Sequence, residues 1–236
     1  DTMNIFIGLL IIAVGAFCQS SSYVPINKIR KWSWESYWLI QGVFAWLIFP
    51  ILGALLAVPQ GHGLFELYAA APKESFLTMF FGELWGVGGL TFGLSMRYLG
   101  VALGQSIALG TCAGLGTIMG PVLLNIFFPE LDALSSLTAA VIIGVVTTLA
   151  GIAIIGIAGG MKSASLSEEE KKEAVKDFNF PKGLAIALLA GFMSGCFNVG
   201  LEFGKELNFG ELTDPMFRTL PATLLVTVGG FLTNAC

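Results

Sequence analysis

The stretch from Leu134 to Gly160, LSSLTAAVIIGVVTTLAGIAIIGIAGG, is apolar along its whole length and contains no charged residue. About 20 such residues suffice for an α-helix to cross the roughly 30 Å hydrocarbon core of a bilayer. The stretch therefore predicts a transmembrane helix, and the same pattern recurs along the chain.

Six further stretches have this character, which gives seven candidate spans. The others are Met3 to Ser22, Tyr37 to Val58, Phe76 to Tyr98, Val101 to Phe128, Gly183 to Phe203 and Leu220 to Ala235. Only 12% of the residues are charged, whereas a soluble domain carries about 25%. Backbone groups inside a bilayer must be hydrogen-bonded internally, and the runs are long rather than alternating. The sequence therefore predicts an all-α, polytopic transmembrane helix bundle.

Positive charges between the spans predict the orientation, because cytoplasmic connections are enriched in Lys and Arg. The connections after the first, third and fifth spans carry Lys28, Arg30, Lys31, Arg97, Lys162, Lys171, Lys172, Lys176 and Lys182. Those after the second, fourth and sixth spans carry only Lys73, Lys205 and Arg218. We therefore expect the odd-numbered connections in the cytoplasm and the N-terminus outside.

One sizeable polar segment, Lys162 to Lys182, predicts a cytoplasmic linker. Within it, Ser167 and Glu170 have the spacing of a capping box, which indicates a short solvated helix. Gly8-Leu9-Leu10-Ile11 resembles Gly183-Leu184-Ala185-Ile186, and an odd number of spans separates the two, as in inverted repeats. The expected organisation is a first five-helix repeat over residues 1–161, a linker over 162–182, and the start of a second repeat over 183–236. The chain ends at Cys236 inside or just past an apolar run, so we interpret it as a fragment.

Glycines and prolines occur within the predicted spans. Pairs of glycines four residues apart predict close helix packing: Gly82/Gly86, Gly89/Gly93, Gly100/Gly104, Gly110/Gly114 and Gly116/Gly120. Pro50, Pro121 and Pro221 are expected to interrupt the second, fourth and seventh spans, because proline removes a backbone donor and bends a helix.

Glu83 is the most informative single residue, since a carboxylate in the middle of a span is costly and usually faces a bundle interior or a water-filled cavity. It is a candidate for binding and releasing a proton during transport. The alternatives are a structural hydrogen bond to another helix and a span boundary that places Glu83 outside the membrane core. Glu202 is a second candidate, although it lies near a helix end, where Lys205 three residues on can pair with it.

Neutral polar and aromatic side chains at membrane depth are candidates for binding a sugar, whose hydroxyls need amides and whose apolar ring face rests on aromatic rings. They are Gln19, Gln41, Trp85, Gln105 and Asn198. Interhelical hydrogen bonds would use the same amides. His62 is the sole histidine and the four cysteines are far apart, so no metal, cofactor or catalytic set is predicted. No phosphate-binding GxxxxGK[ST] string is present.

Three strings of sequence resemble one known family. They are Tyr23 to Glu35, with Lys31-Trp32-Ser33-Trp34-Glu35; Trp85 to Gly100, with Met96-Arg97-Tyr98-Leu99-Gly100; and Phe178 to Leu184. Their order and spacing are similar to those of the L-rhamnose/proton symporters, a branch of the drug/metabolite transporter superfamily, and the resemblance runs over essentially the whole chain. Glu83 departs from the family, in which this position can be small and apolar.

The resemblance implies ten spans in two inverted five-helix halves, of which about three lie outside this chain. It also implies a bacterial inner-membrane location and import of L-rhamnose or a related deoxy sugar with a proton, by alternating access. The implied partners are the sugar, protons and lipid, without nucleic acid or a cofactor, and the sequence defines no oligomeric state. The alternatives are another transporter of the superfamily, an integral membrane enzyme or a sensor.

Overall fold

The computed structural model describes residues 2–21, 32–165, 167 and 177–236. The chain divides into two compact units, Asp1–Gln41 and Gly42–Cys236. The described residues form helices, turns and loops and contain no β-strand. The all-α prediction is therefore confirmed. The predicted repeats, which meet at the linker over residues 162–182, are defined by internal symmetry and not by compactness, so they stay a prediction.

The first unit contains α1 (Thr2–Ser21) and most of α2 (Trp34–Gly42). A π-helical segment, η2 (Val43–Ile48), continues α2 into α3 (Phe49–Leu56). The remaining α-helices are α4 (Leu64–Ala70), α5 (Pro72–Leu99), α6 (Val101–Phe127), α7 (Ala139–Ser165), α9 (Phe180–Phe203) and α10 (Leu220–Ala235). Three short 3-10 helices lie in the loops: η3 (Pro129–Leu131), η4 (Ala133–Ser136) and η5 (Gly210–Leu212).

Each of the seven predicted spans coincides with helix. Among the described residues, five helices are long and apolar enough to cross a membrane: Ser36–Leu56, Pro72–Leu99, Leu103–Phe127, Ala139–Lys162 and Phe180–Phe203. Ile5–Cys18 and Leu220–Ala235 are shorter apolar helices. The predicted boundary at Leu134 was wrong, because Asp132 adopts a positive φ of 43° and a 3-10 turn follows before α7 begins. The helix α4 was not predicted, and the capping box at Ser167 falls in a segment that lies largely outside the described residues.

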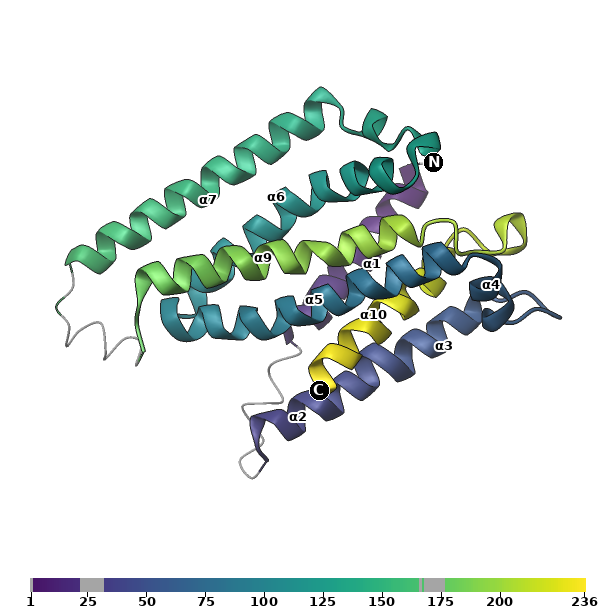
Figure 1. Ribbon diagram of the computed structural model, residues 1–236, viewed down its shortest axis with the longest axis horizontal. Helices are drawn as coiled ribbons and strands as arrows, with labels where there is room; N and C mark the ends of the chain where they lie inside the picture. The colour runs from purple at the N-terminus through teal and green to yellow at the C-terminus, as the bar shows by residue number, and fades with distance from the viewer. Residues whose placement is uncertain (1, 22–31, 166, 168–176) are drawn as a thin grey trace. The chain divides into compact units, whose positions relative to one another are not determined.

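In the second unit, α9 lies between α5 and α6, while α10 lies between α5 and α3; α7 packs on α6 (Figure 1). Two buried clusters hold α5, α6 and α9 together. The larger cluster contains Phe81 from α5, Leu124 from α6 and Phe203 from α9, and the smaller one contains Leu99, Ile107 and Ala187 from the same three helices. The three-helix layer α5–α9–α6 is thus the core of this unit.

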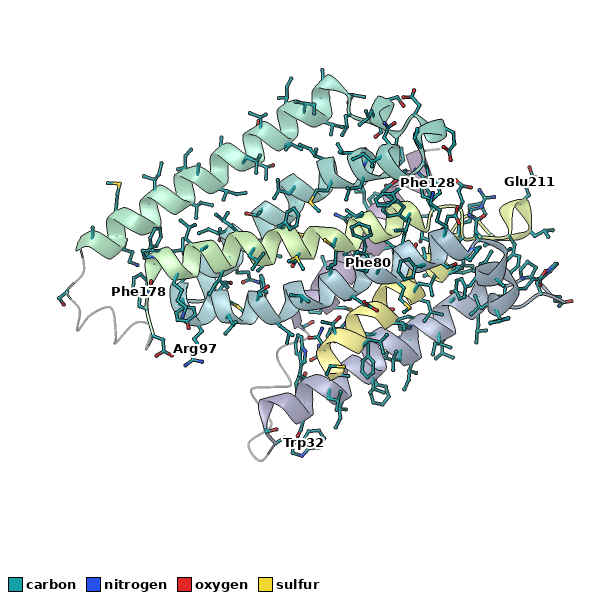
Figure 2. All side chains as sticks on the ribbon, in the orientation of Figure 1. Trp32, Phe80, Arg97, Phe128, Phe178 and Glu211 are labelled. Carbon is teal, nitrogen blue, oxygen red and sulfur yellow. The ribbon has the colours of Figure 1, made fainter. Side chains whose placement is uncertain are left out.

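Polar contacts mark the two ends of the layer. At one end Arg97 pairs with Asp177 at 2.7 Å and Lys182 donates to the Tyr98 hydroxyl at 2.9 Å. At the other end Lys73 donates to the carbonyl of Phe127 at 2.9 Å and lies over the ring of Phe128. Figure 2 shows Arg97 with Phe178 at the first end and Phe128 with Glu211 at the second. The connections after the third and fifth predicted spans therefore meet at one end, as alternating spans require.

Proline acts differently at its three positions. Pro50 follows the π-helical segment, so the second span is irregular there as expected. Pro121 lies inside α6, which continues as α-helix on both sides of it, so the expected interruption of the fourth span was wrong. Pro221 instead occupies the first turn of α10, where a missing N–H costs nothing. The expectation that it interrupts the seventh span was wrong. Its carbonyl accepts a hydrogen bond from the Tyr68 hydroxyl at 2.9 Å, and burial raises the pKa of Tyr68, which keeps this donor neutral.

The glycine spacing predicted close packing, and most of the pairs confirm it. Gly82 and Gly86 lie against the backbone of α10, while Gly116 and Gly120 lie against α9. Gly93 is the exception, since a Cβ there would meet nothing within 4 Å. Gly100 has a second role: its φ of 79° turns the chain directly from α5 into α6, a conformation that L side chains rarely adopt.

Candidate functional site

Trp85 lies in a group of three aromatic rings from three different elements, which we call the aromatic trio: Trp46 of η2, Trp85 of α5 and Phe197 of α9. The ring centroids are 5.7 Å apart for Trp46 and Trp85, and 5.0 Å apart for Trp85 and Phe197, both in edge-to-face arrangements. All three side chains are half-buried. Gly230 of α10 leaves the space that the Trp85 ring fills. The trio therefore brings together one predicted sugar-binding residue and two further aromatic rings.

The local sequence explains the position of Trp46. An α-helix running into Pro50 would direct the proline ring at the carbonyl of residue 46, four residues earlier. The chain instead forms a π turn, in which the Phe49 amide donates to the carbonyl of Phe44, five residues back. Gly42 completes the arrangement, because a Cβ at this position would lie 3.1 Å from the Trp46 ring.

Asn198 and Glu202 lie one turn apart on α9, and both face glycines of α6. A Cβ at Gly116 would lie 3.0 Å from the Asn198 amide nitrogen, and one at Gly120 would lie 3.2 Å from Cγ of Glu202. The Glu202 carboxylate is 3.8 Å from the Lys205 ammonium, as the spacing predicted. Since Phe197 and Asn198 are adjacent in sequence, the aromatic trio and this polar pair occupy neighbouring faces of α9.

Glu83 lies on α5 and is half-buried. Its backbone is fixed against α10: a Cβ at Gly229 would lie 2.8 Å from the Glu83 amide nitrogen, and the Thr233 hydroxyl donates to the Glu83 carbonyl at 3.0 Å. Glu83 and Trp85 are two positions apart, and at about 100° per residue their side chains leave α5 in nearly opposite directions. The structure therefore does not bring the predicted acid together with the aromatic trio.

The three glutamines differ in their surroundings. Gln41 lies at the end of the first unit, and its Oε1 is buried without a hydrogen-bond partner among the described residues. Gln105 is exposed on α6. Gln19 lies in α1, but its side chain is outside the part of the structure that is described.

Sequence reasoning missed two residues that connect helices. Thr233 and Asn234 of α10 both donate to carbonyl groups of α5, Thr233 to Glu83 at 3.0 Å and Asn234 to Gly86 at 3.2 Å. They are the only adjacent polar pair near the end of the last apolar run, which is the signal that would have found them. Phe197 was also missed, because nothing in the sequence distinguishes it from other core phenylalanines.

No group of three His, Cys, Asp or Glu side chains within the described residues could hold a metal ion.

Comparison with known proteins decides the family. The family model of the L-rhamnose-proton symport protein matches residues 2–236. The chain belongs to the L-rhamnose-proton symport protein family. It is 34% identical over 234 residues to the L-rhamnose-proton symporter of Cronobacter sakazakii, and 32% identical over 241 residues to that of Escherichia coli. These alignments cover 98% and 99% of this chain.

The chain spans 65% of the length of both relatives. The match to the family model confirms the resemblance seen in the sequence, which rested on three strings: Tyr23 to Glu35, Trp85 to Gly100 and Phe178 to Leu184. Together with the long apolar helices, family membership makes this chain part of a multi-pass membrane protein. No solved structure matches it.

Proposed function

We propose that the protein is a proton-coupled secondary transporter that imports L-rhamnose or a related deoxy sugar across the bacterial inner membrane by alternating access. Family membership over residues 2–236 carries this proposal, since the relatives named above are L-rhamnose-proton symporters. Such a protein moves its substrate without chemical change, so the enzyme alternative is set aside.

We further propose that the chain contributes seven of ten spans arranged as two inverted repeats, with the first repeat over residues 1–161 and the second beginning at 183. The N-terminus faces outward and the end of the layer with Arg97 and Lys182 faces the cytoplasm. The excess of Lys and Arg in the odd-numbered connections supports this orientation.

The sugar site of this proposal contains Trp85 and Asn198. Aromatic rings accept the apolar face of a sugar, and a side-chain amide both donates and accepts, which matches a hydroxyl group. Trp85 and Asn198 suit these roles because both keep part of their surface open while lying on the central helices α5 and α9. Gln41, Gln105 and Gln19 stay candidates on residue type alone.

Glu83 is the proposed proton-binding group. It lies in the interior of the 28-residue helix α5, and no ion pair within the described residues compensates its carboxylate. Glu202 is the alternative, but its charge is already partly compensated by Lys205. An acid at membrane depth without a cation beside it is costly to the fold and is usually functional, which favours Glu83 over Glu202.

Uptake of radiolabelled L-rhamnose into cells or proteoliposomes tests this proposal. We expect accumulation that collapses when an uncoupler removes the proton gradient. Glu83→Gln is expected to abolish accumulation driven by the gradient while retaining sugar exchange, and Glu211→Gln, in the exposed helix η5, serves as the control. Uptake by the native protein that does not depend on the proton gradient would contradict symport. Gradient-driven uptake that is retained in Glu83→Gln but lost in Glu202→Gln would show that Glu202, not Glu83, is the proton-binding group.

A further inference from the structure

The aromatic trio differs from ordinary aromatic packing in this molecule. Phe81 and Phe203 stack nearly parallel, with centroids 5.2 Å apart, and are only 7% and 3% exposed. Trp46, Trp85 and Phe197 instead meet edge to face, at interplanar angles of 72° and 64°, and are half-buried. The phenylalanine pair is closed into the core, whereas the three rings of the trio are only half-buried, so each keeps part of its surface exposed.

The backbone that carries Trp46 is itself unusual. π-helical residues make up well under about 1% of protein structure, and single π turns are frequent at functional sites. Here the π turn lies inside a helix long and apolar enough to cross a membrane, just before Pro50, which has no N–H to donate to the carbonyl of Trp46 in an α-helix. Gly42 and Pro50 at its two ends both favour the observed position of Trp46, the first by leaving room for its ring and the second by disfavouring α-helical geometry.

The structure of the sugar indicates which of its groups would contact the trio. L-Rhamnose is a 6-deoxyhexose, so it carries a methyl group where the otherwise identical L-mannose carries a hydroxymethyl group. Aromatic ring surface accepts a methyl group but gives a hydroxyl no hydrogen-bond partner. Asn198 follows Phe197 in sequence, so its amide leaves α9 about 100° around the helix from the trio, toward Gly116 of α6. The proposed site uses this amide for the ring hydroxyls of the sugar.

We propose that Trp46, Trp85 and Phe197 form the subsite that receives the C6 methyl group of the sugar, and that the π turn positions Trp46 for this role. The inference rests on the proposed transport of a deoxy sugar and adds the residues that distinguish it from the 6-hydroxy sugar. Trp46, Trp85 and Phe197 are then specificity residues, and Gly42 is a positioning residue that acts through Trp46.

Competition measurements on the full-length protein test the subsite. Inhibition of labelled L-rhamnose uptake by unlabelled L-rhamnose and by L-mannose gives a preference ratio, which we expect to be about 10- to 100-fold in favour of rhamnose. In Trp46→Leu and Phe197→Leu the ratio should fall severalfold toward one. Phe44→Leu is the matched control, since Phe44 belongs to the same π turn but is 50% exposed, and it should leave the ratio unchanged.

A second pair of variants tests the positioning role of the π turn. Gly42→Ala places a methyl group 3.1 Å from the Trp46 ring, whereas Gly53→Ala on the same long helix meets only Leu220 at 3.7 Å. We expect Gly42→Ala to lower the rhamnose preference and Gly53→Ala to leave it unchanged. Equal ratios in these two variants would overturn the positioning role.

Tryptophan fluorescence separates the inference from the function on which it rests. Rhamnose added to the purified protein should change the emission of the native protein, and this change should be lost in Trp46→Phe and reduced in Trp85→Phe. A native protein that neither binds nor transports rhamnose would refute the proposed function. If the native protein transports rhamnose, but the Trp46 variants have the same preference ratio and the same fluorescence response as the native protein, the subsite alone would be overturned.

Discussion

Two helix interfaces in the second unit use glycine in different ways. Between α5 and α10, a Cβ added at Gly82 would collide with the carbonyl oxygen of Val226, and one added at Gly86 would lie 2.8 Å from the carbonyl oxygen of Gly230. The two backbones therefore lie directly against each other. Between α6 and α7, a Cβ at Gly110 would meet the side chain of Ile152, and one at Gly114 would meet the side chains of Leu149 and Thr148. Glycine spacing is the same in both pairs, yet an added Cβ would meet backbone at the first interface and side chains at the second.

The difference indicates which interface can rearrange. Where backbones touch, the two helices are held in one register, and Thr233 and Asn234 reinforce that register by donating to α5 carbonyls. Where side-chain tips fill the gap, rotamer changes accommodate movement at little cost. We therefore expect α5 and α10 to move as one body and α7 to shift more readily against α6.

The largest effect is expected from Gly82→Ala. The added methyl group collides with the Val226 backbone, which cannot rotate away, so the free energy of unfolding should fall by about 3 kcal/mol, the upper end of the usual overpacking range. Unfolding by a denaturing detergent in mixed micelles measures it. Gly93→Ala on the same helix is the control, because nothing lies within 4 Å of its Cβ position. Equal stability of the two variants would show that α5 and α10 are not in backbone contact.

Gly114→Ala should cost less, about 1 kcal/mol at most, the lower end of the same range. Its Cβ would lie 3.0 Å from Cδ2 of Leu149, the flexible end of a side chain that can adopt another rotamer. The same unfolding measurement applies. A loss as large as that of Gly82→Ala would remove the distinction between the two interfaces.

The sequence was sufficient for the helices but not for these interfaces. Apolar length predicts a span whatever its neighbours are, and the helices coincide with all seven predicted stretches. Spacing alone could not tell Gly82, which meets a backbone, from Gly93, which meets nothing, because the difference depends on which helix lies opposite. Family membership was likewise predictable, since the strings that carry it are local and ordered.

The candidate site was predictable only in part. Trp85 and Asn198 were identified by type and depth, but their neighbours Trp46 and Phe197 come together through α5, α9 and the π turn, whose extra backbone residue has no clear sequence signature besides Gly42 and Pro50. Glu83 was identified by charge, and its direction away from Trp85 already follows from their spacing of two positions on one helix. What the sequence could not show is that α10 lies against the Glu83 backbone.

Thr233→Val tests the hydrogen bonds that reinforce the α5–α10 contact. Valine keeps the branched shape but removes the donor to the Glu83 carbonyl, and such interhelical bonds in membranes contribute about 0.6 kcal/mol on average. Thr223→Val is the matched control, since the Thr223 hydroxyl donates only within its own helix, to Thr219 at 2.8 Å. The unfolding free energies of the two variants should differ by about that average; indistinguishable values would mean that glycine packing alone holds the register.

The smallest effect should have the opposite sign. Gly151 lies on α7 with nothing within 4 Å of its Cβ position, as do Gly144 and Gly156. Gly151→Ala should stabilise the helix by about 0.5 kcal/mol, because alanine loses less backbone entropy on folding than glycine does. The measurement is the same detergent unfolding, made on the full-length protein. Destabilisation by more than about 1 kcal/mol, the size of an overpacking penalty, would mean that another helix lies closely against this face of α7. In that case α7 would be held as firmly as α10, and the expectation that it shifts against α6 would be wrong.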